Sequence, residues 1–197
     1  MRRCTGSRRR SHGGGMKGRA VTALALFATL QAVFSDVHPY CDQVLQDGQD
    51  SCDKGKPGMV GRKACARHVA SYSAGQLAAA VTATRVLGFR ASWGGLLAGT
   101  AINAVTHYAI DRREPLKKFL LSDRARKLRL VGGGKAGYLR HATVQRRDGV
   151  VDESGPGTAL TECDQALHRL IGVLASLTTT WLAVRGGLTP NNEEFSL

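Results

Sequence analysis

The chain has 197 residues, and its 28 lysine and arginine residues against 15 aspartate and glutamate residues give a formal net charge of +13. This length predicts one domain with tails. This charge fits a protein that binds nucleic acid or anionic lipid, and it also fits a membrane protein whose cytoplasmic side is basic. The five cysteines are odd in number and form no C-x-x-C pair, which argues against a disulfide framework. The chain also lacks Rossmann, nucleophile-elbow, helix-turn-helix and zinc-finger signatures, which argues against those classes of enzyme and DNA-binding protein.

The N-terminal stretch 1–19 is rich in arginine, glycine and serine, and this composition predicts a disordered basic tail. Met16 is an alternative start, because the sequence after it resembles the beginning of a membrane protein. The stretch 20–46 opens with an apolar run and predicts the first membrane helix. A cleaved signal peptide is the rival interpretation, but no small-x-small cleavage site follows the run, and three more apolar stretches do.

These three further stretches are each about as long as the roughly 20 residues that a bilayer requires. They lie at 64–88, 92–111 and 158–184. A polar loop (46–63) precedes them, and a polar tail (185–197) follows. The mean hydropathy of −0.17 is low for a membrane protein, because it averages the apolar stretches with two very basic ones. The pattern predicts an all-α fold, a four-helix integral membrane bundle over residues 20–184 in the cell membrane, with small residues in the third helix suited to close contact.

A long basic segment, 112–156, separates the third and fourth apolar stretches. The positive-inside rule places it in the cytoplasm, and its charge predicts attraction to anionic lipid head groups. One part of it, KKFLLSDRARKLRL, is typical of a basic amphipathic helix that lies on the membrane surface. No specific nucleic acid is expected as a partner, because no recognition motif accompanies the charge and aromatic residues are few.

Three of the six histidines have an aspartate four residues away, and side chains at this spacing lie on one face of a helix. A rise of 1.5 Å per residue puts these pairs and a fourth histidine roughly 24 to 34 Å along an up-and-down bundle, at one membrane face. The seven residues are His38, Asp42, His68, His107, Asp111, Asp164 and His168. Imidazole and carboxylate groups turned inward at one level predict a site for a divalent metal ion such as Zn²⁺ or Mn²⁺.

The histidines are the expected direct ligands of such an ion. Asp42, Asp111 and Asp164 could bind it, orient the imidazoles or, as the catalytic candidates, take a proton from water. The alternative is a structural or proton-relay cluster without a metal, because ionisable groups buried in lipid must pair. Pro39 directly follows His38, and a proline disfavours helical geometry in the residue before it, which would turn Asp42 away from His38.

The segments around these residues resemble the motifs of a family of small multi-pass membrane proteins of unknown function, common in actinobacteria. The segments are H-x-x-x-D-x-x-x-Q at 38–46, D-K-G-x-P-G at 53–58, H-V-A-S-Y at 68–72, T-H-Y-x-x-D-R-R-x-P-L at 106–116 and D-Q-x-x-H at 164–168. The resemblance covers about 34–181. Its pattern is also distantly similar to membrane-bound metal-dependent hydrolases, which implies metal binding and hydrolysis.

The leading expectation is an integral membrane protein with a His/Asp metal site at one membrane face, and the resemblance adds metal-dependent hydrolysis. A second hypothesis is a non-enzymatic membrane protein with a structural cluster and a basic loop that binds lipid or a protein partner. A third is a soluble, basic helical regulator that binds DNA. The run Gly132–Lys135 is not a phosphate loop, because Ala136 stands where Ser or Thr would hold magnesium.

Overall fold

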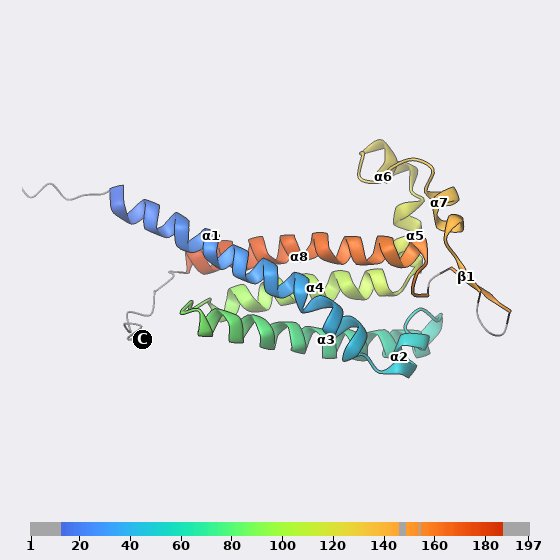
Figure 1. Cartoon of the computed structure of the whole chain (residues 1–197), viewed down its shortest axis with the longest axis horizontal. Helices are drawn as coiled ribbons and strands as arrows, with labels where there is room; N and C mark the ends of the chain where they lie inside the picture. Colours follow the sequence, from blue (N-terminus) through green and yellow to red (C-terminus); the bar gives the residue numbers. More distant parts are fainter. Residues whose placement is uncertain (1–12, 146–148, 154, 187–197) are drawn as a thin grey trace, which may run out of the picture.

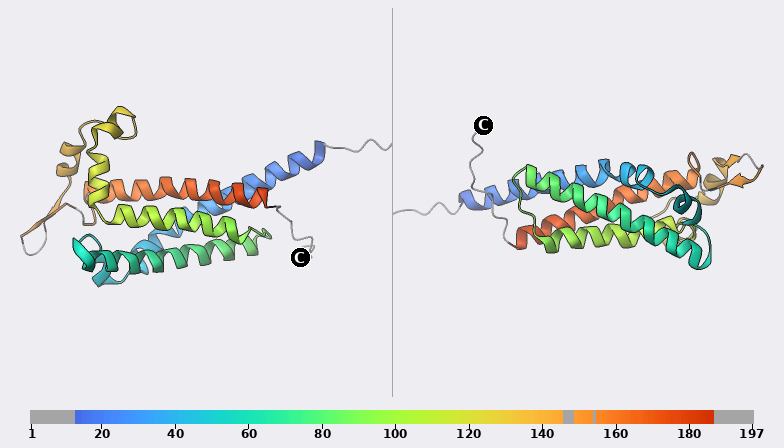
Figure 2. Two further views of the ribbon diagram at one scale, coloured as in Figure 1. Left: turned by 180° about the vertical axis from the view of Figure 1, so that it is seen from behind. Right: turned by 90° about the horizontal axis from the view of Figure 1, so that it is seen from below.

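A computed structural model describes residues 13–145, 149–153 and 155–186. The protein is mostly helical, which confirms the predicted all-α class. Its four long helices are α1 (Gly13–Asp36), α3 (Gly58–Val86), α4 (Trp93–Asp111) and α8 (Ala159–Arg185). They lie side by side, each antiparallel to the next along the chain, and the first turns of α1 project beyond the others (Figures 1 and 2). The arrangement is an up-and-down bundle.

The segment between α1 and α3 is more ordered than the polar loop that the sequence predicts. After α1 the chain forms a short π-helix, η1 (Tyr40–Val44), and then a helix, α2 (Gly48–Asp53). The Asp47 side chain caps α2 by accepting hydrogen bonds from the backbone nitrogens of Gln49 and Asp50. A carboxylate at this position satisfies backbone donors that the first helical turn leaves free. The loop therefore carries a helix beside one end of the bundle (Figure 1).

Small residues allow α4 and α8 to approach closely. A Cβ atom on Gly99 would collide with Thr179 Oγ1, and one on Gly95 would lie 2.9 Å from the Thr179 carbonyl oxygen. Gly94, one residue from Gly95, meets nothing within 4 Å. The glycine pair thus sets the distance and the relative rotation of these two helices, as expected where backbones pack tightly.

The bundle buries polar side chains and exposes apolar ones. Its interior contains an aliphatic cluster around Leu26, Leu30 and Phe34. Polar residues are buried beside it: Gln76, Thr84, Asn103, Ser176 and Thr179. Leu170, Leu174, Leu177 and Trp181 form an exposed stripe on α8, each at least half accessible. The interior of the bundle is therefore partly polar, and part of the outer surface of α8 is apolar.

Two helical segments are long and apolar enough to cross a membrane, namely Lys17–Val44 and Ala159–Arg185. Helices α3 and α4 do not meet the same criterion of length and composition. By length and composition, the first and the last long helix of the bundle could therefore each cross a membrane.

The basic segment 112–156 contains more structure than the predicted loop. It holds three short helices, α5 (Glu114–Leu120), α6 (Asp123–Lys127) and α7 (Lys135–His141), and one antiparallel pair, β1 (Val144–Gln145) with β2 (Val151–Asp152). The prediction of one amphipathic helix across KKFLLSDRARKLRL is wrong. Ser122 has an extended backbone and caps α6 by accepting a hydrogen bond from Ala125 N, so the helix breaks there.

The two predicted tails lie largely outside the described residues, which begin at 13 and end at 186. The prediction of disorder fails for 13–19, because α1 already includes these residues. Four of these seven residues are glycines, which helix propensity disfavours, and this composition is why the sequence predicted a tail here.

Candidate metal centre

All seven predicted side chains meet inside one end of the bundle, the end beside α2. His38 and Asp42 come from the junction of α1 and η1, and His68 comes from α3. The other four come in two pairs, His107 and Asp111 from α4 and Asp164 and His168 from α8. Six of the seven are buried, and Asp164 is half-buried. The spacing of four residues puts each pair on one helix face, and the bundle turns these faces toward each other.

Four of these residues place one ligand atom each around a common point. His68 Nε2 lies 2.9 Å from His107 Nε2 and 3.1 Å from both Asp42 Oδ1 and Asp111 Oδ2. His107 Nε2 lies 3.5 Å from Asp42 Oδ1 and 3.3 Å from Asp111 Oδ2. The four atoms come from three elements and lie within 4.8 Å of one another, so they form a group that could hold a metal ion.

Asp111 also belongs to a second, more open group. Its other oxygen, Oδ1, lies 3.3 Å from His168 Nε2, which lies 3.5 Å from Asp164 Oδ2. These three residues form another set of possible metal ligands. One carboxylate therefore takes part in both groups, one through each oxygen.

The structure keeps His38 apart from both groups, although the sequence predicts it as a ligand. Its Nδ1 lies 3.0 Å from the Tyr72 hydroxyl, and its Nε2 lies 3.2 Å from Gln165 Oε1. Asp42 Oδ2 is 3.7 Å from His38 Nε2. Gln165 in turn donates to Asp42 Oδ2 at 3.0 Å and to Asp164 Oδ2 at 3.2 Å. His38 thus orients a neighbouring amide that binds two of the carboxylates.

Pro39 does not turn Asp42 away from His38, contrary to the sequence expectation. The proline has helical dihedral angles, φ −61° and ψ −34°, and the chain widens after it into the π-helix. Leu45 N donates to Tyr40 O at 3.0 Å across this wider turn. The single π turn keeps Asp42 directed into the bundle, and such turns occur often at functional sites.

Aromatic stacking orients the His107 ring. The ring lies between Tyr72 and His168, with centroids 4.0 Å and 4.2 Å away and interplanar angles of 22° and 28°. Its Nδ1 has no hydrogen-bond partner among the described residues. Stacking on both faces therefore fixes the plane of the ring, and its Nε2 lies toward the carboxylates.

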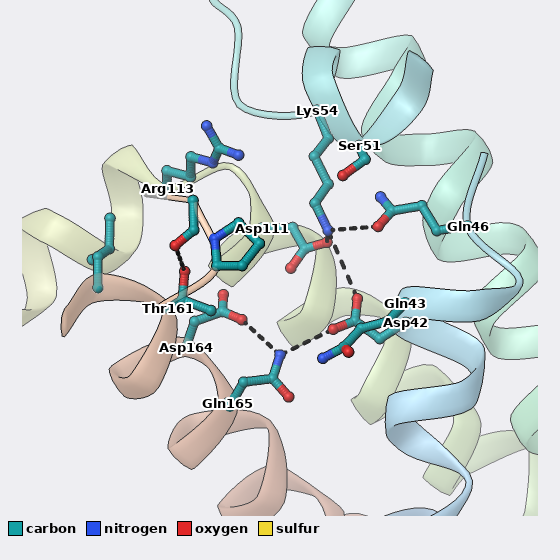
Figure 3. A pocket seen from close by; sticks show the side chains of 13 residues that line it. Asp42, Gln43, Gln46, Ser51, Lys54, Asp111, Arg113, Thr161, Asp164 and Gln165 are labelled. Carbon is teal, nitrogen blue, oxygen red and sulfur yellow. Dashed lines mark hydrogen bonds and ion pairs between the residues drawn. The ribbon is translucent and has the colours of Figure 1, made fainter. Parts of the chain in front are cut away.

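Lys54 is one of the site residues that the sequence did not predict. Its Nζ lies 2.8 Å from Asp111 Oδ2 and 3.7 Å from Asp42 Oδ1, and it donates to Gln46 Oε1 at 3.4 Å (Figure 3). Burial alone would lower the pKa of Lys54, but the Asp111 and Asp42 carboxylates outweigh it and raise that pKa above its usual value. Lys54 therefore stays charged beside the cluster. Lys54 lies in the D-K-G-x-P-G segment, which was the one sequence feature that could have indicated it. No sequence spacing predicts, however, that this loop lies beside the histidines.

A cavity of about 310 Å³ opens over the three carboxylates. Asp42, Asp111 and Asp164 face it together with Lys54 and Gln165, and Arg113 lies across from them (Figure 3). Tyr72, Gln165 and Arg113 were also not singled out as site residues from the sequence. The ligand atoms are therefore buried on one side and accessible from a small polar cavity on the other.

The donor set suits a borderline divalent cation. Two imidazole nitrogens with two carboxylate oxygens are ligands that Zn²⁺ takes in tetrahedral sites, and mixed nitrogen and oxygen sites also hold Mn²⁺. Lys54 supplies one positive charge where such an ion would supply two. The residues present thus fit a metal ion, and they also form a paired cluster without one.

Comparisons with known proteins give no relative: no family model matches the chain, and neither a curated protein nor a solved structure is significantly similar to it.

Proposed function

We propose that this chain is a multi-pass membrane protein that binds Zn²⁺ or Mn²⁺ through Asp42, His68, His107 and Asp111 at one membrane face, and that the ion serves a hydrolytic reaction. The motif resemblance supports the same assignment, including membership of the small multi-pass membrane family. The observation that carries the proposal is the spacing of the four donor atoms.

The five recorded separations among these atoms run from 2.9 to 3.5 Å. Metal–ligand bonds of 2.0 to 2.1 Å in a tetrahedron place neighbouring ligand atoms about 3.3 to 3.4 Å apart. The observed separations bracket this value. Four donors from different parts of the chain thus have the mutual spacing that one small ion would impose.

Hydrogen bonding explains the same spacing less well. The Nε2 atoms of His68 and His107 carry at most one hydrogen each, yet five close separations involve them. Two hydrogens cannot fill five contacts, whereas one cation at the centre contacts all four atoms. The count supports a metal ion over a hydrogen-bonded clamp.

Membrane insertion is supported by the distribution of charge along the helices. Charged residues are absent from 20–35, 68–84, 93–110 and 170–184 in the four long helices. At 1.5 Å per residue these stretches are roughly 22 to 27 Å long, close to the roughly 30 Å thickness of the hydrocarbon core. Arg19, Arg85 and Arg185 mark one edge, and the metal cluster lies at the other. Together with the exposed leucines of α8, this favours a bilayer around the bundle.

Hydrolysis is supported by the position of the cavity. A divalent ion bound by these residues supplies a Lewis acid for a carbonyl or phosphoryl oxygen. Asp164 is the best candidate for the general base, because its side chain is 19% accessible and faces the cavity. Asp42 and Asp111 are 6% and 1% accessible and have their oxygens directed at the imidazoles, which suits ligands better than bases.

Metal content tests the proposal. We expect about one equivalent of Zn or Mn per chain in detergent-purified protein, measured by mass spectrometry, and loss of that metal in His68→Ala/His107→Ala. His141→Ala is the matched control, because His141 is exposed on α7 and far from the cluster in the chain. Protein that remains in the membrane pellet after carbonate washing supports insertion, and release into the supernatant contradicts it.

One observation favours the second candidate, a structural cluster without metal. The Lys54 ammonium lies 2.8 Å from Asp111 Oδ2 and already compensates part of the negative charge. If wild-type protein from metal-replete cells contains no metal, the cluster is structural, and the function lies with the basic segment and its lipid or protein partner.

A further inference from the structure

Two cations line the cavity, and the proposed metal site needs neither as a ligand. Lys54 reaches it from the loop after α2, and Arg113 reaches it from the junction of α4 and α5 (Figure 3). Lys54 is paired with the carboxylates, as described above. Among the described residues no carboxylate oxygen lies within 4 Å of the Arg113 guanidinium. Arg113 is half-buried and is one of the residues that line the cavity.

The backbone holds Arg113 in an unfavourable conformation. Its φ is +61° and its ψ is −50°, in a region that residues with a Cβ atom seldom occupy. Hydrogen bonds on both sides secure it, since Arg113 N donates to Ile110 O at 2.9 Å and Arg113 O accepts from Lys117 N at 2.9 Å. Strain of this sort is retained where the surrounding structure enforces it, commonly at binding sites.

The loop that carries Lys54 is shaped around the two adjacent arginines. Arg112 donates through Nη1 to Lys54 O at 2.6 Å and through Nη2 to Lys56 O at 2.7 Å. Between those two carbonyls, Gly55 lies against the Arg113 side chain, and a Cβ atom there would be 2.7 Å from Arg113 Cδ. The arginine pair therefore fixes the Lys54 backbone and positions the Arg113 side chain over the same loop.

A metal ion would reverse the sign of the charge in the cavity. Among the residues that line the cavity, Asp42, Asp111 and Asp164 contribute −3, and Lys54 and Arg113 contribute +2, so the lining sums to −1. A divalent ion changes this sum from −1 to +1. The loaded cavity then attracts an anion, and the metal-free cavity does not.

We propose that this cavity binds a phosphate group, with Arg113 and Lys54 as its cationic contacts. This inference rests on the proposed function, because the metal supplies the charge that makes an anion favourable. A phosphate monoester suits the site better than a carboxylate, because it carries about −1.5 to −2 charge and three acceptor oxygens. Two cationic side chains and a metal ion can therefore each contact a different oxygen of the phosphate. The cavity volume of about 310 Å³ is at the small end for ligand pockets, which fits a head group rather than a large molecule. The phosphate belongs either to a lipid head group or to free phosphate.

Titration calorimetry on detergent-purified full-length protein tests this inference. The ligands are inorganic phosphate, dihexanoyl phosphatidic acid and acetate, each added to protein as purified and to chelator-treated protein, with metal content measured on the same samples. We expect the metal-loaded protein to bind phosphate at least about 10-fold more tightly than it binds acetate. We also expect phosphate to bind the metal-loaded protein at least about 10-fold more tightly than the chelator-treated protein. Tighter binding of the lipid than of inorganic phosphate identifies a lipid head group as the source, and equal binding identifies free phosphate.

Arg113→Asn is the decisive variant, because it removes the guanidinium and keeps a short polar side chain. It should weaken phosphate binding at least about 10-fold while the metal content stays unchanged. Arg124→Asn is the matched control, as Arg124 is exposed on α6 and should bind phosphate as wild type does. Gly55→Val is a second variant that displaces the Arg113 side chain without changing charge, and it should weaken binding in the same direction.

The outcomes separate the two proposals. Metal-loaded protein that binds acetate as tightly as phosphate, or that binds phosphate equally well with and without Arg113, overturns the phosphate site and leaves the metal site intact. Wild-type protein without metal overturns both.

Discussion

The Nε2 atoms of His68 and His107 lie 2.9 Å apart, although they belong to different helices and are 39 residues apart in the chain. Two imidazole nitrogens at this distance are held together by a shared proton or by a shared cation. Two carboxylates flank the same pair of nitrogens and stabilise positive charge there, whether a proton or a metal ion carries it.

Asp111 should matter more to metal binding than Asp164, because Asp111 faces both ligand groups and Asp164 only one. We expect Asp111→Asn to reduce the apparent metal affinity by at least about 100-fold, beyond the 10- to 100-fold typical of residues outside the ligand set. Asp164→Asn should reduce it less. Competition with a chromogenic chelator measures both, and Asp36→Asn, an exposed aspartate at the end of α1, is the control. Equal effects of the two cluster variants would contradict the shared role of Asp111.

Tyr72 supports the site in two ways that two substitutions separate. Tyr72→Phe removes only the hydroxyl that bonds His38 Nδ1, and it should lower the free energy of unfolding by about 1 kcal/mol. Tyr72→Ala also removes the ring stacked on His107, and it should lower that free energy by about 3 to 5 kcal/mol. Thermal unfolding in detergent compares the variants. A Tyr72→Phe variant as unstable as Tyr72→Ala would show that the hydroxyl, not the stacked ring, is the support.

Close packing of α4 on α8 predicts a steric effect at Gly99. A methyl group there meets Thr179 Oγ1, so Gly99→Ala should destabilise the bundle by about 1 to 3 kcal/mol. Gly94→Ala is the matched control on the same helix, because a Cβ atom at Gly94 has nothing within 4 Å. Thr179→Ala combined with Gly99→Ala should recover part of the loss, which a double-mutant cycle on melting temperatures would reveal. Strict additivity of the two changes would place the strain elsewhere.

Lys54 should give the metal-free protein a specific dependence on high pH. The Asp111 and Asp42 carboxylates outweigh burial and raise the pKa of Lys54 in the folded protein, so protonated Lys54 stabilises the fold. This contribution is fully present below the unfolded pKa of about 10.4 and is lost as the pH rises through the higher folded pKa. The melting temperature of chelator-treated wild type should therefore fall above about pH 10.4 more steeply than that of Lys54→Met.

At neutral pH the Lys54→Met variant should be less stable than wild type, because two buried carboxylates lose their cation. Lys63→Met, an exposed lysine on α3, serves as the control for a general loss of positive charge. Addition of Zn²⁺ or Mn²⁺ should restore part of the stability of Lys54→Met, since a divalent ion compensates the same carboxylates. Identical pH curves for wild type and Lys54→Met would remove Lys54 from the electrostatics of the site.

The sequence alone determined the features that depend on local geometry. Four apolar stretches of membrane length predicted the four long helices and the all-α class. The spacing of four residues predicted which histidine and aspartate share a face, as in His107 and Asp111. The constant rise per residue then predicted a common level for the seven side chains, because a level along a bundle needs only the helix ends as reference. Whether they bind a metal stays a prediction.

Only the tertiary structure decided how far each helix is rotated about its axis and which loop closes over the cluster. Rotation depends on packing between distant segments, such as Gly99 against Thr179, and it places His38 on Tyr72 and Gln165 rather than among the ligand atoms. Lys54 enters the cluster because Arg112, 58 residues further along the chain, holds its loop through backbone carbonyls. Contacts of this kind leave no periodic trace in a sequence, since they join one residue to one distant backbone atom.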